Sequence, residues 1–176
     1  MLFRSNDTAT TEIYTQRYTL SLHDALPIFD ADPDLCYAST HQSPLYPGTG
    51  ARVERGVGAA TGTKHNRPLA PGSGDDAFVE AWRDDLLPAV EAFVPEAIVV
   101  SAGYDAHAAD PLASLRVTED GYAEVAAELG ELSSRLGLAG VALTLEGGYD
   151  LAALRASASA TVRGILDGRR AASGSR

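Results

Sequence analysis

Apolar positions follow two different patterns along the chain, a helical period and short continuous runs, and the pattern separates expected helices from expected strands. Between residues 75 and 94 the apolar side chains recur every three to four positions, which is typical of a helix with one buried face. Asp75 or Asp76 can cap this helix, and Pro88 is expected to kink or divide it. The apolar positions are Phe78, Trp82, Leu86, Val90 and Phe93.

Three short apolar runs lack the helical period and predict strands. The runs 97–100 and 141–145 are continuous, which is typical of strands covered on both faces of a sheet. A third candidate strand spans residues 35–39. The pattern then predicts a loop over residues 40–50 and an irregular stretch, rich in glycine and proline, over 51–74.

Two further helices alternate with the last two strands. Thr118 can cap a helix that reaches about Leu136. Asp150 can cap a last helix that extends to about Leu166, and Gly168 is expected to stop it. The order strand, helix, strand, helix predicts two parallel strands joined by a right-handed crossover. Because ligands bind beyond the carboxyl ends of such strands, the residues after each strand are candidates for a site.

A short polar motif follows each of these two strands. Ser101-Ala-Gly-Tyr-Asp-Ala-His107 places the carboxylate of Asp105 at one strand end, and Leu145-Glu-Gly-Gly-Tyr149 places the phenol of Tyr149 at the other. Taken singly, Asp105 could cap a turn and Tyr149 could be a packing residue. Together, a carboxylate that can hold a metal and a hydroxyl that can donate to an oxyanion indicate a metal-dependent amide hydrolase.

Composition and charge narrow the classes of function. The 176 residues suffice for one domain, and a net charge of −10 argues against a nucleic-acid partner, whose protein surfaces are usually basic. The single cysteine, Cys36, excludes an internal disulfide and fits a reducing compartment. No apolar run approaches the roughly 18 residues of a membrane span, and the chain starts without a signal-peptide pattern. We therefore expect a cytoplasmic protein without a membrane partner, and the oligomeric state stays open.

The first 28 residues differ in kind from the rest of the chain. They show no sustained helical or strand period and contain few aliphatic residues. Residues 6–15 and 19–28 resemble the translation of a common short-read sequencing adapter, so His23 and Asp24 are given no role. The expected division is a non-native, disordered segment over residues 1–28, a partial domain over 29–168 and a disordered tail over 169–176.

Five motifs occur in the order found in zinc-dependent histone deacetylases and their bacterial relatives, the acetylpolyamine amidohydrolases and acetoin-utilisation proteins. The resemblance covers about residues 29–166. It implies an arginase/deacetylase-like α/β fold with a parallel sheet and helices on both faces, of which this chain would hold the C-terminal half. The motifs are Ser39-Thr-His-Gln42, Tyr46-Pro-Gly-Thr-Gly50, Pro71-Gly-Ser-Gly-Asp75, Ser101 to Leu112, and Leu145 to Tyr149.

The resemblance assigns the chemistry residue by residue. Asp105 looks like one of three zinc ligands, and Tyr149 looks like the hydroxyl that polarises the acetyl carbonyl and stabilises the tetrahedral oxyanion. Ser39 matches a position that helps bind a structural monovalent cation, such as potassium. The implied cofactor is zinc, and the implied substrate is an acetylated lysine or polyamine.

Other residues receive supporting roles from the same resemblance. Tyr46 resembles an aromatic that lines the acyl-lysine tunnel, with packing of its own loop as the alternative. Gly147 and Gly148 would let the backbone approach the substrate closely. The remaining polar candidates are interpreted as structural: His107 beside the site, Asp110 fixing its loop, His41 and Cys36 in packing, and His65 in a loop.

The resemblance also implies residues that this chain lacks. A catalytic zinc needs about three protein ligands, and the family supplies two from an Asp-x-His motif just before the segment that matches residues 30–39. No such motif occurs between Phe29 and Leu35, and the histidine pair that acts as general base and acid is absent as well. We therefore expect a deacetylase fragment that is inactive alone and exposes apolar surface and an open sheet edge.

Two alternatives remain open at this point. The chain could be a non-catalytic interaction module that keeps the fold without its metal site. It could also belong to the arginase-type binuclear metal hydrolases. That family places a second carboxylate two residues after the first, where this chain has His107.

Overall fold

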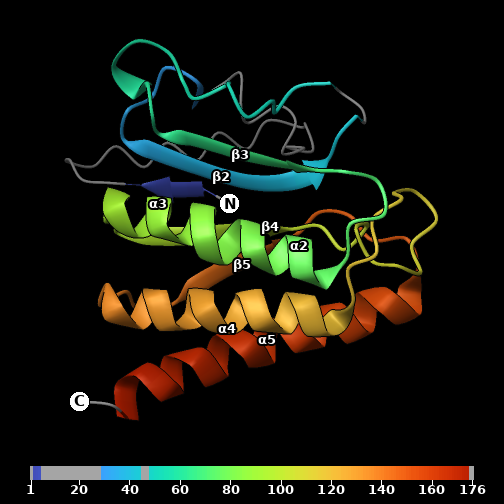
Figure 1. Cartoon of the computed structure of the whole chain (residues 1–176). Helices are drawn as coiled ribbons and strands as arrows, with labels where there is room; N and C mark the ends of the chain where they lie inside the picture. Colours follow the sequence, from blue (N-terminus) through green and yellow to red (C-terminus); the bar gives the residue numbers. More distant parts are fainter. Residues whose placement is uncertain (1, 5–28, 45–47, 175–176) are drawn as a thin grey trace, which may run out of the picture.

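The computed structural model describes residues 2–4, 29–44 and 48–174, and it shows one five-stranded sheet with helices packed against it (Figure 1). The strands are β1 (Leu2–Arg4), β2 (Leu35–Gln42), β3 (Lys64–Leu69), β4 (Ala97–Ala102) and β5 (Val141–Leu145). The helical elements are η1 (Gly58–Ala60), α2 (Asp75–Glu80), the π-helical turn η2 (Ala81–Leu86), α3 (Leu87–Phe93), α4 (Glu119–Arg135) and α5 (Leu151–Gly174).

The sheet has the order β3-β2-β1-β4-β5. The pairs β2–β3 and β4–β5 are parallel, which confirms the predicted arrangement of the two strands that precede the polar motifs. β1 is antiparallel to both β2 and β4, so the other four strands all run in one direction. Residues 2–4 thus form a strand, contrary to the disorder expected for residues 1–28. Residues 1 and 5–28 lie outside the described part of the chain.

The helix expected over residues 75–94 forms with an interruption in its middle. A π-helical turn separates α2 from α3, and Pro88 lies in the first turn of α3. Proline lacks the N–H that an α-helical interior requires, and a widened turn before it accommodates the ring. The cap of α4 also forms as predicted, since the Thr118 hydroxyl oxygen accepts a hydrogen bond from Asp120 N at 3.3 Å.

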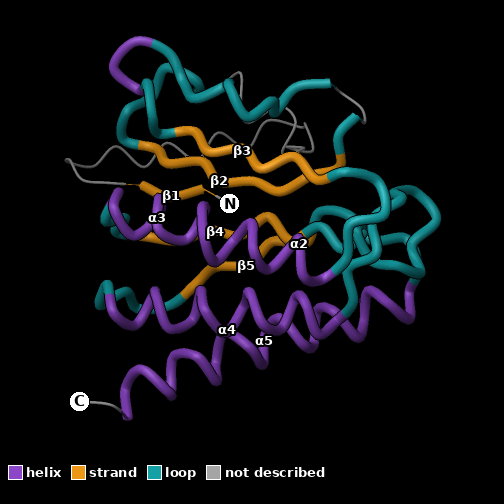
Figure 2. Tube along the Cα trace, in the orientation of Figure 1, coloured by secondary structure: helices purple, strands orange, loops and turns teal. Residues whose placement is uncertain are grey.

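The last helix is longer than the sequence predicts. Asp150 caps it as expected, because its Oδ1 accepts from Ala153 N at 2.8 Å. Gly168 does not end the helix, which continues to Gly174 and includes most of the tail expected to be disordered. Gly168 instead lies against α4, where an added Cβ would overlap the carbonyl oxygen of Ala127. The two helices therefore pack side by side at close range (Figure 2).

The strand β3 replaces part of the stretch that was expected to be irregular. Its first residue, Lys64, is almost fully buried, and its ammonium donates to Leu35 O at 2.6 Å and Asp32 O at 3.0 Å. Carbonyl oxygens that are distant in sequence thus stabilise a charge inside the protein. Burial lowers the pKa of Lys64, and the nearby Asp32 opposes this shift. His65 follows on the same strand rather than in a loop.

The core lies between the helices and one face of the sheet. Ile98 and Ala102 of β4 join a buried cluster with Trp82 and Leu86 of η2 and Leu129 of α4. The indole N–H of Trp82 also donates to Thr40 Oγ1 of β2 at 3.1 Å, which fixes this helical turn to the sheet.

The expectation that β4 and β5 are covered on both faces is wrong. Four of the five residues of β5 are exposed, and Leu145 retains 62% of its accessible surface. Val99 of β4 is 37% exposed. These residues are exposed because β5 is the outermost strand of the sheet and because Val99 faces away from the buried cluster. Exposed apolar surface and an open edge, which the sequence predicted, are therefore present at this side of the sheet.

Candidate functional site

A cavity of about 560 Å³ lies at the carboxyl ends of β2, β4 and β5. Asp105, Tyr149 and Ser39 all line it, so the structure brings the predicted metal ligand, the predicted oxyanion donor and the predicted cation site together. Asp105 and Tyr149 follow the ends of β4 and β5, and Ser39 lies within β2. This placement follows from the shared direction of the parallel strands.

The loops that carry Asp105 and Tyr149 stay paired beyond the strands. Glu146 N donates to Ala102 O at 3.0 Å, and Tyr104 N donates to Gly147 O at 2.9 Å. The Asp105 carboxylate then lies directly against Gly147, where an added Cβ would be 2.9 Å from Oδ2. Glycine is required here because a side chain would displace the carboxylate.

Gly147 and Gly148, the two glycines of the motif Leu145 to Tyr149, lie against other residues of this chain. Gly147 makes room for Asp105, and Gly148 has a φ of +126°, with Tyr104 and Leu154 close to where an added Cβ would lie. A left-handed φ of this kind favours glycine over other residues. Their prediction as residues that approach the substrate stays untested, and the structure gives them a role in shaping the loop under Asp105.

Asp110 links the two loops through its carboxylate. Oδ2 accepts from Tyr149 N at 2.6 Å and from Asp150 N at 3.3 Å, while Oδ1 accepts from Leu112 N at 3.0 Å. The residue is buried. The sequence predicted that Asp110 fixes its own loop, and the structure adds that it positions the backbone of Tyr149.

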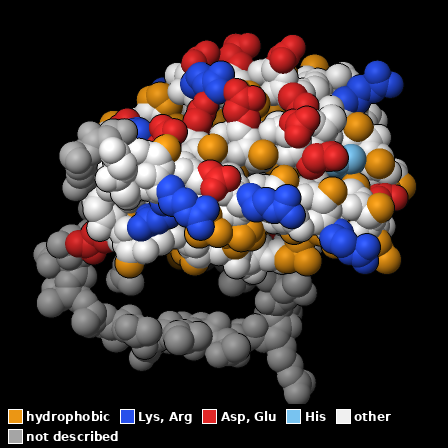
Figure 3. All heavy atoms as spheres, turned by 90° about the horizontal axis from the view of Figure 1, so that it is seen from below, with side chains coloured by type: hydrophobic (Ala, Val, Ile, Leu, Met, Phe, Trp, Pro, Cys, Tyr) orange, Lys and Arg blue, Asp and Glu red, His pale blue; other side chains and the backbone are white. Residues whose placement is uncertain are grey.

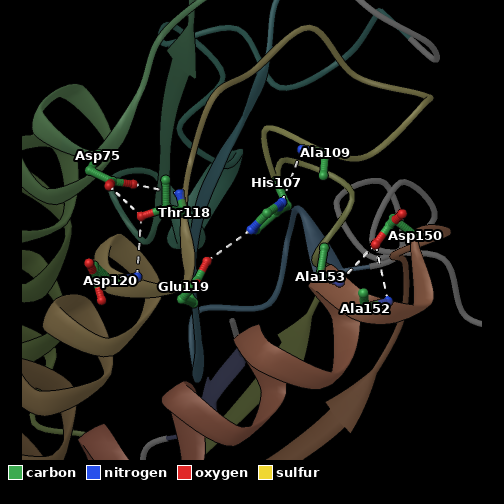
Figure 4. Close-up of polar contacts among 9 residues, drawn as sticks. All are labelled: Asp75, His107, Ala109, Thr118, Glu119, Asp120, Asp150, Ala152 and Ala153. Atoms are coloured by element: carbon green, nitrogen blue, oxygen red, sulfur yellow. Dashed lines mark hydrogen bonds and ion pairs between the residues drawn. The ribbon is translucent and has the colours of Figure 1, made fainter.

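His107 fixes the same loop to the start of α4 (Figure 4). Its Nδ1 accepts from Ala109 N at 3.0 Å, so Nδ1 carries no proton and the proton on Nε2 faces Glu119 Oε2 at 3.2 Å. The backbone N–H of Glu119 and the His107 contact lower the pKa of Glu119. The Asp75 carboxylate accepts hydrogen bonds from N and Oγ1 of the preceding residue, Thr118, at 2.7 and 2.6 Å.

Tyr122 lies in the cavity wall and was not anticipated from the sequence. Its hydroxyl is buried and has no hydrogen-bond partner among the described residues. Burial, together with the charge of Asp105, raises the pKa of Tyr122. The helical period marks Tyr122 only as a core position, so no signal in the sequence singles out its hydroxyl.

The other predicted residues fall in different settings. Ser39 is buried, and its Oγ lies 3.3 Å from His41 Nδ1. Tyr46 lies outside the described residues. Cys36 is fully buried, and burial raises the pKa of its thiol to about 12.

The described residues do not form a metal site by themselves. They contain no group of three or more His, Cys, Asp or Glu side chains that could hold an ion. Asp105 is thus the one predicted zinc ligand in this part of the chain, whereas a catalytic zinc needs about three. Within the same described ranges, no helix is long and apolar enough to cross a bilayer.

Comparison with known proteins identifies the family. Residues 26–165 match the sequence model described as the histone deacetylase domain. The chain belongs to the histone deacetylase family. It is 44% identical over 138 residues to histone deacetylase 10, chloroplastic, of Oryza sativa subsp. japonica, which corresponds to 78% of this chain and 31% of that protein. It is 40% identical over 124 residues to a probable deacetylase of Archaeoglobus fulgidus, with coverages of 70% and 34%.

Solved structures show that this deacetylase-family chain has the family's fold. The acetylpolyamine aminohydrolase from Burkholderia pseudomallei matches with a TM-score of 0.69 and 36% identity, over 80% of this chain and 40% of that one. The histone deacetylase Clr3 matches with a TM-score of 0.72 and 31% identity, over 82% of this chain and 25% of that one. The chain spans about a third of the length of the curated relatives that it matches.

Proposed function

We propose that the domain to which residues 29–168 belong hydrolyses acetyl-amides of lysine or of polyamines, and that this chain alone is inactive. The observation that carries the proposal is the joint placement of Asp105 and Tyr149 on one cavity, with Asp110 linking their loops. The names of the relatives support the substrate class, since they include deacetylases and an acetylpolyamine aminohydrolase.

Each of the two residues has a defined task in this proposal. The Asp105 carboxylate supplies one oxygen ligand to zinc, the metal implied for the family, whose chemistry when bound is to polarise water and the acetyl carbonyl. The Tyr149 hydroxyl donates to the carbonyl oxygen as negative charge develops there. A single donor of this type contributes about 10² to 10³ in kcat. Tyr149 is 59% exposed, so its ring can reach a substrate at the cavity mouth.

Inactivity of this chain follows from what surrounds Asp105. One carboxylate does not hold zinc usefully. The histidine nearest to it in sequence, His107, already uses both ring nitrogens in contacts with Ala109 and Glu119. Zinc titration by calorimetry should therefore show no sub-micromolar binding at one-to-one stoichiometry, and acetyl-lysine peptides and acetylputrescine should not be hydrolysed. Tight stoichiometric binding would contradict this part of the proposal.

The activity of the whole domain can be tested in a chimera. Residues 29–166 would replace the matching segment of the Archaeoglobus probable deacetylase, and the product would be assayed with an acetyl-lysine peptide and with acetylputrescine. We expect turnover, a loss of about 10² to 10³ in kcat with Tyr149→Phe, and loss of both turnover and bound zinc with Asp105→Ala. Unchanged kcat in a folded Tyr149→Phe chimera would overturn the assignment of Tyr149.

A non-catalytic interaction module is the second candidate, favoured by the absence of a complete metal site among the described residues. The chimera separates the two. A folded, zinc-loaded chimera without turnover on either substrate would favour the module. The arginase-type alternative is disfavoured because His107, at the position of the second carboxylate, is committed to Glu119.

A further inference from the structure

The carboxylate of Asp110 joins the two loops that carry the predicted metal ligand and the predicted oxyanion donor. Asp110 lies between β4 and α4, on the same loop as Asp105. Its side chain reaches the segment after β5, where Oδ2 accepts from Tyr149 N at 2.6 Å and from Asp150 N at 3.3 Å. The first of these bonds is short, as bonds to a charged acceptor are. One oxygen atom of Asp110 thus fixes the backbone from which the Tyr149 ring extends.

The Asp110 side chain is itself held in one position. It is 8% exposed, and its second oxygen, Oδ1, accepts from Leu112 N at 3.0 Å. Its backbone N–H donates to His107 O at 2.9 Å. The three groups that donate to the carboxylate are all backbone N–H groups, which suits a side chain that only accepts. Asp110 is therefore a fixed anchor on the loop of the metal ligand.

The other end of this contact is the start of α5. Tyr149 directly precedes Asp150, whose Oδ1 accepts from Ala152 N at 3.0 Å and from Ala153 N at 2.8 Å (Figure 4). Further along, Gly168 of α5 lies against the backbone of α4, so the helix is closely packed. Tyr149 thus sits between a packed helix and an anchored carboxylate.

The Tyr149 side chain depends on this backbone for its position. The residue is 59% exposed, so few neighbours restrain the ring. A small rotation of the backbone moves the hydroxyl, at the far end of the ring, by a larger distance. A displacement of about 1 Å in a reacting group can cost about 10² in rate. The contact from Asp110 is therefore placed where it can control the reach of the hydroxyl.

We propose that Asp110 is a positioning residue, which holds the Tyr149 hydroxyl at a fixed place relative to Asp105 and raises kcat through that hydroxyl alone. The kinetic part rests on the proposed function. The positional part does not, because it can be measured without zinc or substrate.

Hydrogen exchange in the full chain tests the positional part. Asp110→Asn keeps the size of the side chain but places an amide NH₂ where an oxygen accepted an N–H. The amides of Tyr149 and Asp150 should exchange at least tenfold faster, the factor implied by the loss of a hydrogen bond to a charged group. The amide of Tyr104, which donates to Gly147 O, should keep its rate. Unchanged exchange at Tyr149 would overturn the proposal.

A double-mutant cycle in the chimera of residues 29–166 tests the kinetic part. Asp110→Asn should lower kcat about tenfold or more, with KM within about twofold and with bound zinc unchanged. In the Tyr149→Phe background the same substitution should lower kcat by no more than about twofold, because no hydroxyl remains to be misplaced. Equal losses in both backgrounds, or loss of zinc, would overturn the proposal, since Asp110 would then act on the fold or on the metal.

Ser101→Ala is the matched control. Ser101 Oγ donates to Glu146 Oε2 at 3.0 Å, a bond that joins the ends of β4 and β5 but does not touch the backbone of Tyr149. Its loss should leave both kcat and exchange at Tyr149 unchanged. An effect as large as that of Asp110→Asn would show that any link between the two segments suffices, and would overturn the specific role of Asp110.

A second variant covers the case in which Asp110→Asn does not fold. Asp110→Glu keeps the charge but moves the carboxylate by one methylene group, so the same pattern should appear at smaller size: faster exchange at Tyr149, and a loss of kcat that is absent in the Tyr149→Phe background. Failure of the proposed function gives a different result, namely an unmodified chimera without turnover, or one in which Tyr149→Phe has no effect.

Discussion

The helix pair α4–α5 and the strand pair β4–β5 lie next to each other but differ in how completely they are packed. In the helix pair, Gly164 and Gly168 of α5 lie directly against the backbone of α4. Arg169 then donates from its guanidinium to Ser133 Oγ at 2.7 Å and to Leu138 O at 3.0 Å. In the strand pair, the outer strand is exposed along most of its length.

The difference shows that burial depends on a partner rather than on the apolar run itself. The helix pair buries residues such as Leu129 and Ile165 because each helix is the other's neighbour. Among the residues that the structure describes, β5 pairs with a strand on one edge only. A second groove lies between β5 and α5, lined by Leu143, Leu151 and Val162. The face seen from below carries apolar, basic and acidic side chains (Figure 3). Val162 and Leu166 of α5 are both exposed.

Gly168→Val should cause the largest loss of stability. A side chain at this position would overlap the Ala127 carbonyl, and backbone on both helices would have to move. We expect a loss of about 3 kcal/mol or more in the free energy of unfolding. Urea unfolding followed by circular dichroism measures it. Gly174→Ala, at a helical glycine with nothing within 4 Å, is the control and should change stability little. Equal effects of the two variants would refute the tight packing.

Asp110→Ala should have the next largest effect, because it leaves the N–H groups of Leu112 and Tyr149 without their acceptor. We expect a loss of about 2 to 3 kcal/mol, since hydrogen bonds to a charged group contribute more than neutral ones. Asp150→Ala, which removes only a helix cap, should cost about 1 kcal/mol in the same urea experiment. If Asp110→Ala cost less than Asp150→Ala, the two loops would not depend on the link between them.

The sequence predicts the packed region better than the open one, for reasons that particular residues make clear. Thr118 and the acidic residues after it mark the start of α4 because capping is local. Gly168 was wrongly predicted to end the last helix, because a glycine that permits close helix contact has the same local sequence pattern as one that ends a helix. β3 could not be predicted from local sequence, because its buried Lys64 donates to carbonyl oxygens about thirty residues away, at Asp32 and Leu35.

In the candidate site, too, some features could be predicted from the sequence and others could not. The positions of Asp105 and Tyr149 beside one cavity follow from strand direction, which apolar runs and motif order reveal. The link from Asp110 to Tyr149 joins residues 39 positions apart, so no local pattern contains it. The orphaned hydroxyl of Tyr122 is likewise a property of the folded cavity. Membership of the deacetylase family accounts for the motifs but does not specify these contacts.

Leu145→Lys should have the smallest effect and tests the open region directly. Leu145 is 62% exposed, so a charged side chain there keeps its hydration, and stability should change by no more than about 0.5 kcal/mol. Leu129→Lys is the matched change in the packed region. Leu129 is 2% exposed, and a lysine there should cost about 3 kcal/mol or more, because its charge has no partner in the core. Comparable losses in urea unfolding would mean that β5 is buried in solution. The contrast between the two pairs would then be false.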